Sequence, residues 1–217
     1  MKLSRSDLFG ATYILAISML LLSFSSEVAQ FTSQHANLAG FFKFALLASF
    51  GECMKNRITS GSWKVEKLFV RAVIWGLFGI WISWAFVLIA TGVEGVIQHD
   101  LWTEQMRPFS MSVWMNIISG YPLAMMFVHF WLDQALEGRL QWPWQLFGQP
   151  ETARWAKIVF ISLVVFWVPA HTFTFSLQPH LRVLCAAYLS IALGLILSFA
   201  ARSRKSSQVE TSIFSNN

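Results

Sequence analysis

The sequence predicts an all-α integral membrane protein, a polytopic bundle of six transmembrane helices. Its composition is the first observation: hydrophobic residues make up 55% of the 217 residues and charged residues only 12%. Soluble domains usually carry about 25% charged residues. The second observation is that the apolar residues gather in blocks of about 17 to 25 residues, the length at which a helix crosses a bilayer.

The apolar blocks define the predicted spans. They cover residues 8–24, 38–54, 68–91, 109–132, 155–177 and 181–200. The first two blocks are short and the second contains Lys43 and Glu52, so a four-span core with two peripheral elements stays open. We expect one transmembrane helical domain over 1–201, followed by a polar, disordered cytoplasmic tail over 202–217.

The basic residues orient the predicted spans, because cytoplasmic loops carry an excess of Lys and Arg. With the N-terminus inside, all of the 16 Lys and Arg residues except Lys43, Arg107 and Arg182 fall on the cytoplasmic side. We therefore expect both termini in the cytoplasm. Short basic loops without an Arg-rich amphipathic presequence favour the inner membrane of a bacterial cell, with peroxisomal and mitochondrial membranes left open as alternatives.

Polar side chains inside the spans are the candidate functional residues, since a charge at the bilayer centre costs roughly 2.5 to 3.5 kcal/mol on insertion scales. From the ~1.5 Å rise per helical residue, Lys43, Asn116 and His171 share one outer layer. Pro169 removes a backbone donor next to His171, which favours a polar pocket there. The candidate polar cavity is formed by Lys43, Asn116, His171 and Thr172.

Each of these residues also has a structural interpretation. Lys43 can extend its long stem toward the interface, and Asn116 can serve only to bond a neighbouring helix. Near the cytoplasmic face, Glu52 and Arg71 carry opposite charges at similar depth. They are a candidate structural ion pair that fixes helix register.

Sequence signatures of catalysis are missing. The chain has no His-Glu-x-x-His, Gly-x-Ser-x-Gly, Walker or dinucleotide-binding motif, and Cys53 and Cys185 have no Cys-x-x-Cys spacing. We therefore expect no enzyme, no catalytic or metal-binding residue and no cofactor, and an intramembrane enzyme ranks third among the functions considered.

The last two blocks contain a spaced set of residues that matches a known family pattern, namely Trp167, Pro169, Phe175, Pro179, Arg182, Val183, Leu184, Leu197 and Ser198. With these residues the chain resembles the family typified by the twenty-two-kilodalton peroxisomal membrane protein and its Mpv-type mitochondrial inner-membrane relatives. It departs from that family where a valine separates Trp167 from Pro169 and where Thr174 stands in place of an asparagine. Taken with the stretches 43–52 and 71–79, the resemblance indicates a bacterial relative.

The resemblance implies a channel-like protein of about four spans without a settled substrate, and it supplies no catalytic residues. We expect a multi-pass membrane protein that acts as a small channel or transporter for a small solute. The alternative is a non-transporting membrane scaffold or stress-related protein whose buried polar residues only specify helix packing. The expected partners are membrane lipids and a small solute, with a homo-oligomer as a further option and no nucleic acid.

Overall fold

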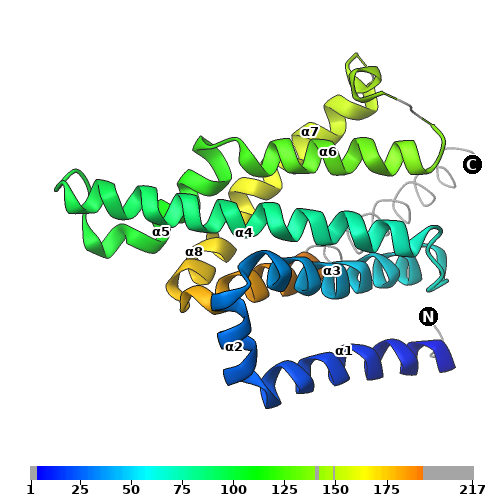
Figure 1. Ribbon diagram of the computed structural model, residues 1–217. Coiled ribbons are helices and arrows are strands. Elements are labelled where there is room, and N and C mark those ends of the chain that lie inside the picture. The colour runs from blue at the N-terminus through cyan, green and yellow to red at the C-terminus, as the bar shows by residue number, and fades with distance from the viewer. Residues whose placement is uncertain (1–3, 140–141, 149, 193–217) are drawn as a thin grey trace, which may run out of the picture. The chain divides into compact units, whose positions relative to one another are not determined.

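A computed structural model of the chain describes residues 4–139, 142–148 and 150–192 (Figure 1). Every regular element in those ranges is a helix and none is a strand, so the predicted all-α class is confirmed. The described residues fall into two compact units, 4–80 with 184–192, and Trp81–Val183. Both lie within 1–201, the stretch predicted as one domain, and the predicted tail over 202–217 lies outside the described residues.

The first unit is built on three consecutive helices, α1 (Arg5–Ser23), α2 (Ser25–Gln34) and α3 (Ala36–Ser60). The short α2 crosses between α1 and α3, which run in roughly opposite directions (Figure 1). The helix α3 ends at Gly61, whose φ of 82° is left-handed, a conformation that glycine adopts without strain. The unit also contains the first part of α4 (Leu68–Gln98) and residues 184–192 of the last described helix.

Glycines set the closest helix contacts in this unit. A methyl group added at Gly79 of α4 would overlap the carbonyl oxygen of Gly40 in α3, and one added at Gly51 would lie 3.4 Å from Cα of Ile191. Gly79 therefore lies where the backbones of α3 and α4 come closest to each other.

The second unit holds two single π-helical turns. The first, η2 (Trp114–Ile118), ends the helix that begins with α5 (Arg107–Val113), and the second, η4 (Leu163–Trp167), lies between α7 (Pro150–Ser162) and α8 (Val168–Ser176). The unit also contains the second part of α4, η1 (Glu104–Met106), α6 (Tyr121–Leu136), η3 (Pro143–Leu146) and the start of the helix over 179–192.

A bend separates the two halves of the fourth apolar block. Glu104–Ile118 and Tyr121–Leu136 meet at 47°. Between them Gly120 has a φ of 66°, and Pro122 stands in the first turn of α6. The left-handed glycine ends one helix and the proline starts the next, so the bend has a local cause.

Three described helical stretches are long and apolar enough to cross a membrane, namely Arg5–Ser23, Leu68–Gln98 and Thr152–Ser176, and the bent pair makes a fourth if it counts as one span. The helix α3 is not among them, and the last described helix continues into residues outside the described ranges. Six spans stay a prediction.

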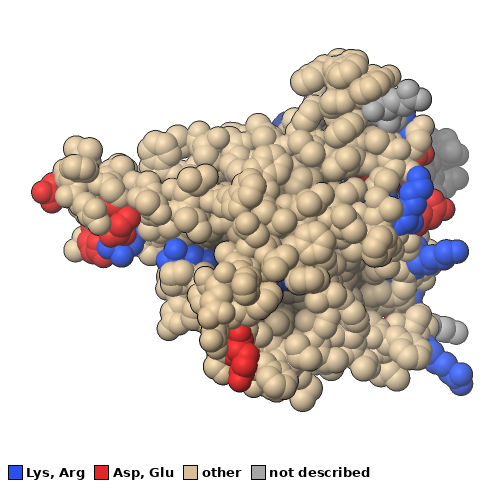
Figure 2. Space-filling model, viewed as in Figure 1, with Lys and Arg blue, Asp and Glu red and all other residues tan. Residues whose placement is uncertain are grey.

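The middle of α4 has an uncharged and apolar surface, as expected for a helix that crosses a membrane. No charged residue occurs between Arg71 and Glu94, and Figure 2 shows acidic and basic side chains near the two ends of α4 with uncharged residues between them. Large apolar side chains are widely exposed, with Phe69 at 81% and Leu88 at 70%. Water-soluble monomers rarely expose apolar surface on this scale.

Candidate functional site

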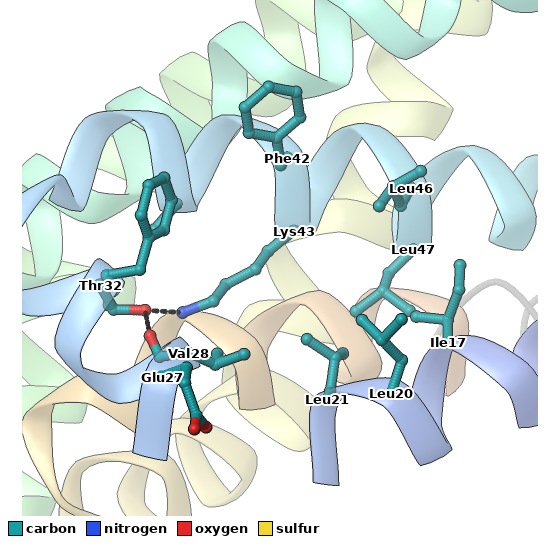
Figure 3. A pocket seen from close by; sticks show the side chains of 12 residues that line it. Ile17, Leu20, Leu21, Glu27, Val28, Thr32, Phe42, Lys43, Leu46 and Leu47 are labelled. Carbon is teal, nitrogen blue, oxygen red and sulfur yellow. Dashed lines mark hydrogen bonds between the residues drawn. The ribbon is translucent and has the colours of Figure 1, made fainter. Parts of the chain in front are cut away.

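A cavity of about 340 Å³ lies among α1, α2 and α3 in the first unit (Figure 3). Its rim reaches the surface, since Leu20 is 58% exposed and Leu46 is 45% exposed. The chain turns sharply at both ends of α2, and these two turns bring apolar side chains of α1, α2 and α3 together around the cavity. Each helix contributes apolar side chains to the wall, among them Leu20 and Leu21 of α1, Val28 and Phe31 of α2, and Phe42 and Leu46 of α3.

Lys43 brings a charge to this apolar wall. The residue is only 7% exposed, and its Nζ donates a 2.8 Å hydrogen bond to Oγ1 of Thr32. The Thr32 hydroxyl donates in turn to the carbonyl oxygen of Val28 at 2.6 Å. Because the hydroxyl proton is used there, Thr32 presents an oxygen lone pair to Lys43.

The ammonium group keeps unused donors. A lysine has three N–H bonds, and Thr32 is the partner of one of them; the other two have no partner within the described part of the chain. Glu27 also borders the cavity, but its carboxylate points away from Lys43 (Figure 3). That carboxylate accepts a 2.8 Å hydrogen bond from the Ser26 hydroxyl.

The second unit contains a separate buried polar cluster. His171 of α8 lies with Nδ1 3.1 Å from Oδ1 of Asn116 in η2, and the two residues are 5% and 2% exposed. Nδ2 of Asn116 donates to the carbonyl oxygen of Ser112 at 2.8 Å. Since the Asn116 nitrogen is a donor, its oxygen accepts, which assigns the hydrogen of neutral His171 to Nδ1.

Two hydroxyl groups converge on one carbonyl beside this cluster. Ser112 Oγ donates to the oxygen of Val168 at 2.7 Å, and Thr172 Oγ1 donates to the same oxygen at 2.8 Å. The Ser112 bond joins α5 to α8, whereas the Thr172 bond stays within α8. The cluster is enclosed by aromatic rings, with Trp167 4.9 Å from the His171 ring between centroids.

The structure therefore divides the predicted polar cavity between the two units. Asn116 and His171 are bonded to each other, and Thr172 bonds a carbonyl next to them. Lys43 belongs to the other unit, where its partner is Thr32. Sequence reasoning missed Thr32 because it lies in the polar segment between the predicted spans 8–24 and 38–54, and that segment folds as α2.

The predicted partners Glu52 and Arg71 lie near each other in the first unit. Nη1 of Arg71 is 3.5 Å from Oε2 of Glu52, and Nε1 of Trp75 donates to Oε1 of Glu52 at 2.7 Å. Trp75 was not predicted as a partner. It follows Arg71 by four residues and so lies on the same helix face, which is a signal that the sequence does contain.

Comparison with protein-family models, curated proteins and solved structures found no match to this chain.

Proposed function

We propose that this chain is a multi-pass membrane protein that takes a small solute into the cavity beside Lys43, as the binding step of a small channel or transporter. One observation carries the proposal: a buried ammonium group with two unused donors faces an apolar cavity that opens to the surface. A charge held away from water is costly unless it is paired, and ionisable groups at membrane depth commonly mark solute paths.

The membrane placement is supported by the apolar, exposed helix surfaces and by the uncharged stretch of α4. The distribution of Lys and Arg favours both termini in the cytoplasm, and the short basic loops without an Arg-rich amphipathic presequence favour a bacterial inner membrane. The resemblance of the last two apolar blocks to the peroxisomal and mitochondrial family is in keeping with a channel-like role.

Cysteine accessibility in intact cells tests the topology. Single cysteines are introduced into a background that lacks Cys53 and Cys185, at Gln34, Ser62, Gln98, Gln141, Gln178 and Ser207. A membrane-impermeant maleimide should label the positions at Gln34, Gln98 and Gln178 and spare the other three. Any other pattern would overturn the six-span topology.

Solute entry is tested by filling the mouth of the cavity. Leu46→Trp adds bulk at the rim, and Leu38→Trp is its matched control, because Leu38 is 52% exposed on the same helix and is not part of the cavity wall. Two readouts apply: thermal stabilisation of the purified protein by 1-octanol, and swelling of proteoliposomes in iso-osmotic glycerol or in potassium gluconate with valinomycin.

We expect Leu46→Trp to reduce octanol stabilisation and to slow swelling, while Leu38→Trp behaves like the wild type. Equal behaviour of the two variants in both readouts would remove the cavity as a solute site. Octanol binding without any swelling above that of protein-free liposomes would leave a binding protein that does not transport these solutes.

The scaffold interpretation remains the second candidate, and the cluster in the second unit favours it. There Asn116, His171 and Ser112 bond one another or a neighbouring helix, as residues that specify packing do. This alternative predicts that His171→Ala lowers the folded yield and leaves swelling per folded molecule unchanged. A fall in swelling at equal folded yield would place His171 in the solute path.

A further inference from the structure

The arrangement around Lys43 also indicates the chemical class of the solute. We propose that the cavity binds a monoanion with a single alkyl chain, whose acidic head pairs with Nζ of Lys43 and whose chain lies against Leu20, Val28 and Leu46. This inference rests on the proposed function and narrows it to a substrate class.

The sign of the charge follows from the donors. Lys43 offers two unused N–H bonds, and Thr32 cannot offer its own because its proton is bonded to Val28. The polar end of the cavity thus offers two hydrogen-bond donors on the ammonium group of Lys43. The acceptor oxygen of Thr32 already receives a hydrogen bond from Lys43. A carboxylate or sulfonate head satisfies the two free donors and neutralises the buried charge.

The amount of charge is limited by the same residues. Among the described residues that line the cavity, Lys43 is the only Lys or Arg, whereas Glu27 adds a negative charge at its border. A second negative charge on the ligand would have no cation of its own there and would be repelled by Glu27. The site therefore favours a monoanion over a dianionic phosphate.

The size of the cavity limits the apolar part of the ligand to a single alkyl chain. Its volume of about 340 Å³ is near the lower end of the ~300 to 1,000 Å³ typical of ligand pockets. The walls along α1 and α3 are aliphatic, and the exposed rim at Leu20 and Leu46 lets a chain continue outward. One alkyl chain of moderate length fits this space better than the two chains of a phospholipid.

Three probes of equal chain length separate charge from apolar burial. Octane-1-sulfonate is a permanent monoanion, 1-octanol is neutral and octyltrimethylammonium is a cation. Their dissociation constants are measured by calorimetry on the purified full-length protein in nanodiscs of neutral lipid. We expect the sulfonate to bind at least about tenfold more tightly than octanol, and the cation to bind more weakly than both.

Substitutions test whether Lys43 causes the expected preference for octane-1-sulfonate over octanol. Lys43→Met should abolish the difference between sulfonate and octanol, and Lys43→Arg should retain it. Lys55→Met is the matched control, since Lys55 lies on the same helix but is exposed and outside the cavity. Glu27→Gln changes an exposed residue, so the fold should tolerate it, and it should tighten sulfonate binding if the charge argument is right.

The outcomes separate the two proposals. If octanol binds, if Leu46→Trp blocks its binding, and if octane-1-sulfonate binds no more tightly than octanol, the anion inference would be overturned and the solute site would stand. Failure of all three probes to bind would overturn both. Displacement of sulfonate by phosphatidylglycerol at lower concentration than by other sulfonates would overturn the single-chain assignment in favour of an anionic lipid.

Discussion

Arg57 holds both carboxylate oxygens of Asp7, a residue 50 positions earlier in the chain. Its Nε donates to Oδ1 at 2.6 Å and its Nη2 to Oδ2 at 2.8 Å. Trp63, in the loop after α3, donates from Nε1 to Oδ1 at 2.8 Å. The first turn of α1 is therefore tied to the last turns of α3, although the apolar sides of α1 are largely exposed.

This ion pair should control the attachment of α1. Arg57→Lys keeps the positive charge but loses the planar two-point geometry, so we expect a lower thermal midpoint and faster proteolysis near Phe24. Asp7→Asn should also lower the thermal midpoint. The double variant should unfold at a midpoint no lower than that of the less stable single variant. Strict additivity in a double-mutant cycle would contradict this coupling.

The contact between α3 and α4 should be sensitive to one methyl group. Gly79→Ala places a Cβ against the Gly40 carbonyl, and we expect a loss of stability of about 1 to 3 kcal/mol or more from overpacking. Gly92→Ala is the control on the same helix, because nothing lies within 4 Å of its added Cβ. Chemical denaturation in mild detergent measures both, and equal stability of the two variants would contradict the close approach.

The Asn116 and His171 pair should contribute to stability through hydrogen bonding. Asn116→Ala leaves the buried Nδ1–H of His171 without its partner, at an expected cost of about 1 to 3 kcal/mol. Ser119→Ala serves as the control, because the exposed Ser119 hydroxyl makes only local bonds, donating to the Met115 carbonyl and accepting from the Tyr121 N–H. Denaturation midpoints measure the difference. If the two variants were equally stable, the contact between η2 and α8 would not be energetically significant.

Glu52 should tolerate amidation better than truncation. Glu52→Gln keeps an oxygen for Trp75 Nε1, whereas Glu52→Ala leaves both Trp75 and Arg71 without this acceptor. Removing one partner of a buried ion pair typically costs about 3 to 5 kcal/mol, so we expect the alanine variant to approach that loss and the glutamine variant to lose less. Thermal unfolding followed by Trp fluorescence reports on both, and the reverse order would be contrary to this geometry.

The helical blocks of this chain were predictable because long apolar runs leave few alternatives. The block 68–91 folds within α4, and 38–54 lies within α3. The segment over α2 was not predictable as a helix, since its sequence is polar and lacks the length of a span. Its helix is held by neighbours, including the bond from Lys43 to Thr32.

The candidate site was predictable in its residues more than in its arrangement. Burial cost singled out Lys43, Asn116 and His171, and the last two are in fact bonded. Depth along a span says nothing about which face of a helix a residue occupies. The separation of Lys43 from the His171 cluster therefore required the three-dimensional structure.

Because of the π-helical turns η2 and η4, the packing of the helices around them depends on the exact number of residues as well as on residue type. In η2 the Ser119 N–H donates to the Trp114 carbonyl, five residues back, so each such turn accommodates one residue more than an α-helical spacing. Each residue advances an α-helix by about 100°. Deleting one residue from η4 would consequently rotate the end of α8 that carries His171 away from Asn116, whereas an exposed loop would absorb the same deletion. Over these two turns the chain is expected to tolerate exchanges of residue type far better than insertions or deletions.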